Sequence, residues 1–137
     1  MTQSRPDPDE RRPGSPLAEH LGFEMVDTND EHTLMRLAIE PHHLNPMGMV
    51  HGGTILSLAD NAATACANRA HAAIEDDGRF MAGIDLHAVL LGNQRGGTIE
   101  ADARTVRAGR RVVVVRTRVT GDDGRLIAEV TTTHIPT

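Results

Sequence analysis

Residues 45–69 read NPMGMVHGGTILSLADNAATACANR, which predicts a loop followed by one alanine-rich helix. Two adjacent glycines, Gly52 and Gly53, stand where this helix would begin. Backbone N–H groups at that place have no partner inside the helix, and no side chain keeps a ligand away from them. The positive end of the helix dipole lies there too, so the stretch predicts a binding site for a polarised oxygen atom.

The expected helix runs from about Gly53 to Ala70 and has little polar surface in its middle. Such a helix is usually buried on nearly all sides. We therefore expect the rest of the chain to be wrapped around it. Its apolar positions are Ile55, Leu56, Leu58, Ala59, Ala62, Ala63, Ala65, Cys66 and Ala67.

Asp60 is the only acidic residue of this helix, and helical spacing places it on one face with Leu56 and Ala63. A lone carboxylate beside an apolar stripe is a candidate for a functional group. The structural alternative is an acid satisfied by the hydroxyl of Ser57 or Thr64, or one solvated at the outer edge of the helix.

Six strands surround the helix in the sequence. In residues 98–106 apolar and charged side chains alternate, as they do in an antiparallel sheet with one wet face. The order of two strands, one helix and four strands predicts an α+β fold, in which a curved antiparallel sheet wraps a single long central helix. The expected strands are 23–27, 32–39, 81–91, 98–106, 111–120 and 125–135.

The first residues have a different composition. Residues 1–16 hold four of the seven prolines, mixed with charged residues, which predicts a disordered segment before a single folded domain at 17–137. A short helical turn is expected to start at Ser15 and Pro16 and to stop at Gly22.

The composition limits the partners and the compartment. The chain has 137 residues, 39% of them hydrophobic, with no Trp or Tyr and two Phe, so its small side chains bury little area each and favour an oligomer. A net charge of −5 argues against binding to nucleic acid or to a membrane surface. The single cysteine, Cys66, cannot form an internal disulfide. Neither a signal peptide nor a membrane span is expected from the sequence. We therefore expect a cytoplasmic protein.

The spacing of several residues resembles the hotdog-fold acyl-CoA thioesterases, in particular the phenylacetate-pathway and 4-hydroxybenzoyl-CoA thioesterase group. The resemblance spans roughly Leu17 to His134, and its most specific part is a His-Gly-Gly run with an acid nine positions after the histidine. The residues that carry it are Asn45, Gly48, His51, Gly52, Gly53, Leu58 and Asp60.

The resemblance implies roles for the catalytic candidates. The backbone N–H of Gly52 would polarise a thioester carbonyl, and the side chain of Asn45 would position substrate or water. Asp60 would attack the carbonyl or activate a water that does, and the sequence leaves both mechanisms open. His51 is either a base or a group that orients Asn45 or the backbone.

The resemblance also implies a substrate site without cofactor or metal, in a homodimer or a dimer of dimers with the active site at the interface. Gly53 and Thr64 would line it. Relatives often have a hydroxyl residue where this chain has Gly83, so Thr64 or a bound water would take over that role. Arg110 and Arg111 are expected to contact the phosphates of coenzyme A.

Three functions remain open at this point. The first is hydrolysis of an acyl-CoA with an aromatic or medium-chain acyl group. The second is a non-catalytic acyl-CoA-binding regulatory protein, which the missing hydroxyl at Gly83 leaves open, whereas the retention of Asp60 favours the enzyme. The third is a hotdog dehydratase or hydratase, which needs a catalytic histidine in another spacing. The adjacent His42 and His43 are expected to be loop residues, because neighbouring side chains diverge and do not chelate a metal.

Overall fold

The computed structural model describes residues 15–137, so most of the segment predicted to be disordered lies outside the described residues. The short N-terminal helix α1, Pro16–Leu21, begins and ends as the sequence predicts. The Ser15 hydroxyl accepts a hydrogen bond from the N–H of Ala18 at 3.1 Å, and Gly22 ends the helix in the left-handed region at φ 82°.

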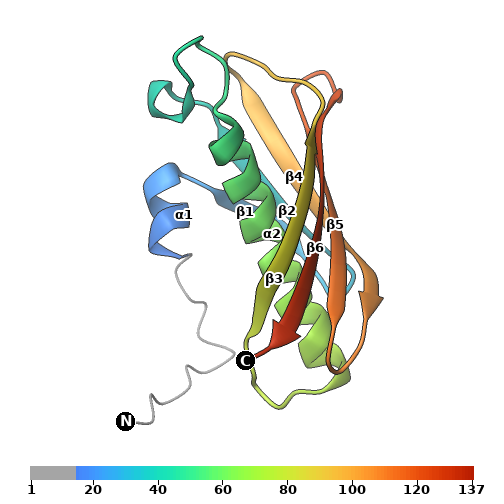
Figure 1. Cartoon of the computed structure of the whole chain (residues 1–137). Coiled ribbons are helices and arrows are strands. Elements are labelled where there is room, and N and C mark those ends of the chain that lie inside the picture. Colours follow the sequence, from blue (N-terminus) through green and yellow to red (C-terminus); the bar gives the residue numbers. More distant parts are fainter. Residues whose placement is uncertain (1–14) are drawn as a thin grey trace.

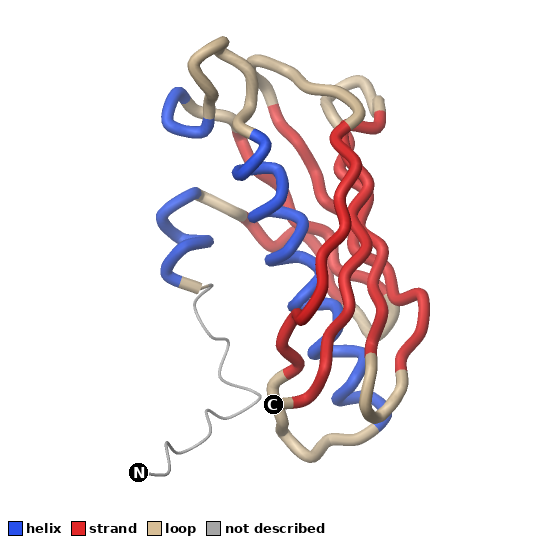
Figure 2. Tube along the Cα trace, viewed as in Figure 1, coloured by secondary structure: helices blue, strands red, loops and turns tan. Residues whose placement is uncertain are grey.

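One long helix and a six-stranded antiparallel sheet make up the domain, which confirms the hotdog arrangement (Figure 1). The strands lie in the order β1-β2-β4-β5-β6-β3, so β3 and β1 form the two edges of the sheet. The trace in Figure 2 shows the sheet curving along the length of the helix. The elements are β1 Glu24–Thr28, β2 His32–Ala38, the 3-10 turn η1 Pro41–His43, α2 Gly52–Ile74, β3 Met81–Leu90, β4 Thr98–Ala108, β5 Val113–Thr120 and β6 Leu126–Pro136.

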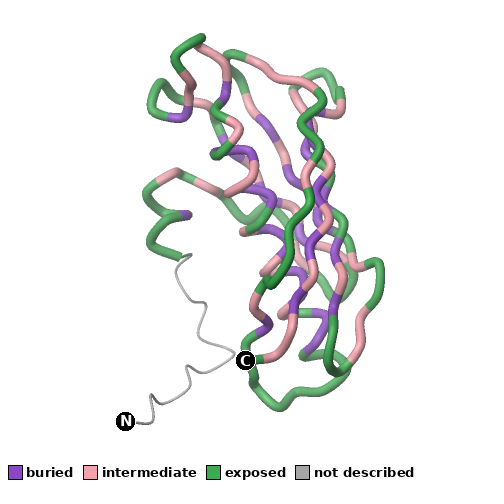
Figure 3. Tube along the Cα trace, viewed as in Figure 1, coloured by how far each residue is buried: buried purple, intermediate pink, exposed green. Residues whose placement is uncertain are grey.

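The core lies between α2 and the sheet (Figure 3). Leu58, Ala59, Ala62 and Ala63 are fully buried on the sheet side of the helix, where small side chains let the strands approach. The prediction that α2 is buried on nearly all sides is wrong for the single chain. Asp60 is exposed on the side that the sheet leaves uncovered, because one curved sheet can enclose only part of a helix.

Strand β3 presents an unusual edge. It pairs on one side only, with β6, and several of its large apolar side chains are exposed. Ile84 is 60% exposed and Leu90 is 51% exposed. An unpaired strand edge with exposed apolar side chains is a favourable surface for association.

Asn68 fastens the start of β3 to the central helix. Its amide nitrogen donates to the carbonyls of Thr64 at 2.9 Å and Met81 at 3.1 Å, and its amide oxygen accepts from the N–H of Met81 at 2.8 Å. Because Gly83 follows Met81 by two residues, this clamp fixes where Gly83 lies relative to α2.

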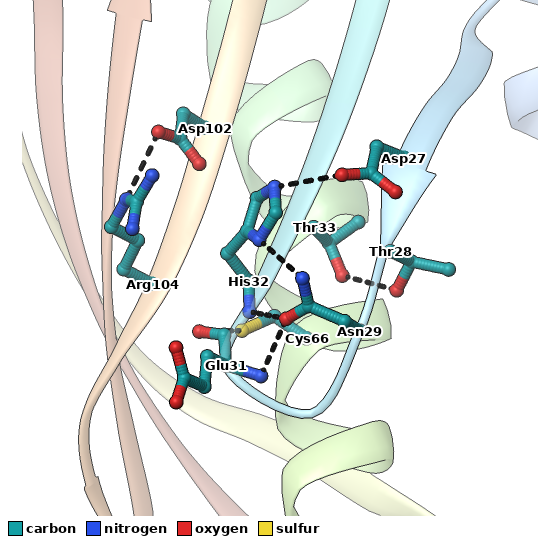
Figure 4. A network of polar contacts seen from close by, with 9 residues as sticks. All are labelled: Asp27, Thr28, Asn29, Glu31, His32, Thr33, Cys66, Asp102 and Arg104. Carbon is teal, nitrogen blue, oxygen red and sulfur yellow. Dashed lines mark hydrogen bonds and ion pairs between the residues drawn. The ribbon is translucent and has the colours of Figure 1, made fainter.

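The turn between β1 and β2 lies against the C-terminal half of α2, near Cys66 (Figure 4). The side-chain oxygen of Asn29 accepts from the N–H groups of Glu31 at 2.8 Å and His32 at 3.0 Å. The thiol of Cys66 lies beneath this turn, 3.6 Å from the hydroxyl of Thr105, and burial raises its pKa. A buried thiol with a raised pKa is a packing group rather than a nucleophile. Within residues 15–137 we find no helix with the length and apolar character needed to cross a membrane.

Candidate active site

The start of α2 offers one unused backbone donor. His51 precedes the helix, and its Nδ1 accepts the N–H of Gly53 at 2.8 Å. The N–H of Gly52, by contrast, has no hydrogen-bond partner among residues 15–137. Of the two glycines singled out in the sequence, Gly52 therefore keeps a free donor at the positive end of the helix dipole. His51 therefore holds the backbone at the start of α2 through the Gly53 N–H.

Asn45 shapes the loop before the helix. Its side-chain oxygen accepts from the N–H groups of Met47 at 2.9 Å and Met49 at 3.2 Å. Its amide NH₂ group makes no hydrogen bond within the described part of the chain and is half-buried. Since the oxygen is held by the loop, the NH₂ group is left in a fixed direction and can donate to a ligand.

His43 anchors the same loop to the N-terminal helix. Its Nδ1 accepts the N–H of Glu40 at 2.9 Å, and its Nε2–H donates to the carbonyl of Leu21 at 2.6 Å. Its own carbonyl accepts the N–H of His51 at 2.8 Å. Both ring nitrogens are engaged and the ring is buried, so His43 is a structural residue and not one of a chelating pair with His42.

Gly48 is required by the shape of this loop, which gives a stability prediction. Its φ is +76°, and an added β-carbon would lie 2.9 Å from Nη1 of Arg95, which donates to the carbonyl of Met47 at 2.8 Å. Gly48→Ala is expected to lower the free energy of unfolding by about 1–3 kcal/mol in urea denaturation. Gly96→Ala, at a site with negative φ and open space, is the control. Equal stability of the two variants would contradict this account of the loop.

Asp60 opens into a cavity of about 380 Å³ on the uncovered side of α2. The cavity brings together three candidates from the sequence, Asp60, Thr64 and Gly83. Asp60 makes no hydrogen bond among residues 15–137. The alternative in which Ser57 satisfies it is wrong, because the Ser57 hydroxyl donates to the carbonyl of Gly53 at 2.7 Å. The other residues that line the cavity are Ser15, Leu17, Ala18, Phe23, Ser57, Asn61, Phe80 and Ala82.

Sequence reasoning missed His134 and the aromatic lining. His134 is fully buried, and its cross-strand partner on β3 is Gly83. Burial lowers the pKa of the imidazole, and the nearby negative charge of Asp60 opposes this shift. Alternation along β6 already puts His134 on the same inward face as Val130. That signal was available, but nothing in the sequence says that β6 lies beside β3.

The predicted phosphate contacts, Arg110 and Arg111, lie outside the residues that line the cavity of the single chain. Arg110 and Arg111 are exposed in the turn between β4 and β5, where the carbonyl of Arg110 accepts from Nε2 of His71 at 3.0 Å. This places them at the C-terminal end of α2, opposite Gly52. The same end holds one group of potential metal ligands, whose ligand atoms lie within 4.8 Å of one another: His71, Glu75 and Asp77. That group lies beyond the residues that line the cavity.

Residues 47–128 match the sequence profile of the Thioesterase superfamily. The match includes Gly52, Asp60 and Gly83. The chain belongs to this superfamily. It is a thioester hydrolase of the hotdog class, similar to the phenylacetate-pathway group, and its family supports acyl-CoA thioesters as the general substrate class.

Relatives of this thioesterase cover most of its length. ComA2 of Bacillus subtilis is 30% identical over 111 residues, 81% of this chain and 86% of the relative. The 1,4-dihydroxy-2-naphthoyl-CoA hydrolase of Listeria monocytogenes is 26% identical over 81% of this chain and 87% of its own. The PaaI protein from the phenylacetic acid degradation operon of Escherichia coli has the same fold, with a TM-score of 0.80 at 18% identity over 88% of this chain and 83% of its own.

Two parts of the thioesterase site are separated within one chain. Gly52 and Asp60 are eight residues apart on a straight helix, which corresponds to about 12 Å along its axis. A single thioester carbonyl cannot contact the Gly52 N–H and an attacking group at Asp60 across that distance. The free donor and the free carboxylate of one chain therefore belong to different halves of a site or to different sites.

Proposed function

We propose that this thioesterase hydrolyses an acyl-CoA with an aromatic or medium-chain acyl group, giving the free acid and coenzyme A. The site combines Gly52 and Asn45 of one copy with Asp60 of a second copy. The observation that carries the proposal is the unpaired N–H of Gly52 at the start of α2, because a fixed donor in that place favours the charge that develops on a thioester oxygen.

The chemistry follows from the free groups. The thioester oxygen accepts the Gly52 N–H, and the Asn45 amide orients the carbonyl or the water. In one route Asp60 takes a proton from a water whose oxygen bonds to the carbonyl carbon, and the carbon–sulfur bond then breaks. In the other route the Asp60 carboxylate attacks the carbonyl carbon, the carbon–sulfur bond breaks and coenzyme A leaves as the thiolate, and water then hydrolyses the resulting anhydride. The exposed, unpaired carboxylate is suited to both.

The lining of the cavity supports an aromatic acyl group. The only two phenylalanines of the chain, Phe23 and Phe80, both line it, together with Leu17. Flat apolar groups pack well against aromatic rings. The Listeria relative is named a 1,4-dihydroxy-2-naphthoyl-CoA hydrolase, and this name also supports an aromatic acyl group.

A panel of acyl-CoAs with a thiol reagent tests the acyl assignment. Benzoyl- and phenylacetyl-CoA are expected to exceed acetyl-CoA in kcat/KM. Phe80→Ala should lower kcat/KM for the aromatic substrates by about tenfold, since one aromatic pair is worth about 0.5–1.5 kcal/mol beyond the area that it buries. Acetyl-CoA, which is too short to reach the ring, is the internal control. An equal loss for all substrates would contradict the aromatic pocket.

The assembly proposed is a homodimer or a dimer of dimers. Three observations support it: the separation of Gly52 from Asp60, the exposed apolar edge of β3, and the uncovered side of α2. Most soluble oligomers are closed and symmetric, so an edge that pairs with a second copy of itself leaves no strand exposed.

The remaining predictions complete the proposal. Arg110 and Arg111 contact the phosphates of coenzyme A, the reaction needs neither cofactor nor metal, and the enzyme works in the cytoplasm.

A regulatory protein that binds acyl-CoA without hydrolysing it is the alternative, since Gly83 lacks a hydroxyl. Binding without thiol release across the whole panel would favour that alternative.

A further inference from the structure

The free edge of β3 carries two complementary polar groups among its apolar ones. Asp85 and His87 are exposed, and neither makes a hydrogen bond or an ion pair among residues 15–137. Leu86, between them, is 41% exposed and stands opposite the buried Thr132 of β6, so it lies on the face towards α2. Because side chains alternate along a strand, Asp85 and His87 lie together on the outer face of the sheet.

Antiparallel pairing of two identical strands limits which residues can meet. The two-fold axis passes through one residue, which faces its own copy, and residues equally far on either side of it face each other. Facing residues always share a side of the sheet, so each choice of axis residue gives a different set of facing pairs. The register of the pairing is therefore defined by the residue that lies on the axis.

The proposed shared site places this axis near the middle of β3. Within one chain a β-carbon at Gly52 would lie 3.2 Å from Cδ1 of Leu90, and a β-carbon at Gly83 would lie 3.9 Å from Oδ1 of Asp60. The start of α2 thus lies beside the end of β3, and Asp60 lies beside its beginning. When Gly52 of one copy approaches Asp60 of the other, Leu90 must come to lie across from the region of Gly83 in the second copy. The axis then crosses β3 midway between these two residues.

Two residues stand at that midpoint, Leu86 and His87, and side-chain chemistry separates them. With His87 on the axis, two imidazoles face each other and Asp85 faces the apolar Val89. With Leu86 on the axis, two leucines meet, and Asp85 of each copy faces His87 of the other. A carboxylate accepts from an imidazole N–H whether the ring is charged or neutral, and complementary pairs that face each other stabilise two strands. Only the second register satisfies both polar groups.

We propose that two copies of the chain pair antiparallel along β3, with Leu86 on the two-fold axis and the Asp85 carboxylate of each copy bonded to the His87 imidazole of the other. The inference rests on the proposed dimer and adds its register. It covers the exposed apolar edge and joins the two six-stranded sheets into one. Asp85 and His87 are then positioning residues, because their pairing sets how Gly52 of one copy approaches Asp60 of the other.

Single cysteines along β3 test the register. Leu86→Cys places two thiols face to face on the axis, with their Cα atoms about 5 Å apart, which suits a disulfide. In His87→Cys and Ala88→Cys the equivalent Cα atoms lie more than about 7 Å apart, too far for a disulfide without backbone movement. The native Cys66 is buried, so the wild type is the internal control. Each variant is oxidised mildly, and the cross-linked fraction is measured on a non-reducing gel.

We expect Leu86→Cys to form about tenfold more cross-linked dimer than His87→Cys, Ala88→Cys or the wild type. A cross-link that forms best at residue 87 or 88 would overturn the register. The absence of a cross-link at all three positions, in a protein that sediments as a dimer, would overturn it too, since the copies would then not meet along β3.

A charge exchange tests the polar pair independently. His87→Asp sets an acid opposite Asp85 twice in each dimer, so the dissociation constant measured by sedimentation of a dilution series should rise by about tenfold. Adding Asp85→His to this variant exchanges the two groups and should restore the constant to within about threefold. The double variant is the matched control, because its composition equals that of the wild type. Unchanged association in His87→Asp, or no recovery in the double variant, would overturn the pair.

The outcomes separate this inference from the proposed function. A different cross-linked position in an active dimer overturns the register alone. A wild-type chain that sediments as a monomer and still hydrolyses acyl-CoA overturns the register and the shared site together. A dimer that cross-links through Leu86→Cys, from a wild type without turnover, supports the register and overturns the proposed hydrolysis.

Discussion

Replacing Asp60 by Asn is expected to lower kcat by about 10²- to 10⁴-fold, the range for loss of a general base, with a loss at least as large if Asp60 is the nucleophile. The amide has nearly the same size as the carboxylate but cannot accept a proton or attack the carbonyl. Steady-state kinetics with the best substrate of the acyl-CoA panel measures the change.

The structure predicts that this loss is not a folding defect. Asp60 is exposed and makes no hydrogen bond among residues 15–137, so thermal denaturation of Asp60→Asn should match the wild type. Asp76→Asn, another exposed acid in the loop after α2, is the matched control and should keep full activity. If Asp60→Asn retains more than about a tenth of wild-type kcat, Asp60 is neither base nor nucleophile.

Replacing Gly52 by Pro is expected to lower kcat by about 10²- to 10³-fold, the cost of removing one donor from an oxyanion site. Proline has no N–H, yet it suits the first position of a helix, and Gly52 is the first residue of α2. The residue before a proline must be extended, and His51 already is, with φ −61° and ψ 133°. The substitution therefore removes the donor and leaves the helix.

Gly52→Ala is the matched control for this variant. An added β-carbon lies 3.2 Å from the flexible end of Leu90 in both cases, so the two variants share this β-carbon contact. Alanine keeps the N–H, and its kcat should stay close to that of the wild type. Equal losses in the two variants would mean that the β-carbon, and not the missing donor, is responsible.

The sequence predicts the fold well because two periodicities are clear in it. Alternation in residues 98–106 and the alanine-rich run of α2 require only local information, and the glycine pair marks the start of the helix within one residue. The burial of α2 was predicted wrongly, because alanine is compatible with both a packed and an open side. The alanine residues around Asp60 therefore do not reveal how much of α2 the sheet covers.

The candidate site could be predicted only in part, since it depends on strand order. His134 lies 74 residues beyond Asp60 in the chain. It lies opposite Gly83, which lines the cavity, because β6 pairs with β3. Periodicity gives the face of a strand and not its neighbour. The free N–H of Gly52 was predictable, whereas the capture of the Gly53 N–H by His51 required the geometry of the ring.

Subunit complementation tests the shared active site most directly. The Asp60→Asn and Gly52→Pro variants, each inactive alone, are co-expressed with different affinity tags, and the hybrid that carries both tags is isolated. One of the two sites in a hybrid dimer then combines an intact Gly52 with an intact Asp60. We predict that the hybrid recovers about half of the wild-type activity per dimer. A hybrid as inactive as its parents, or a failure of the two chains to associate, would contradict the account.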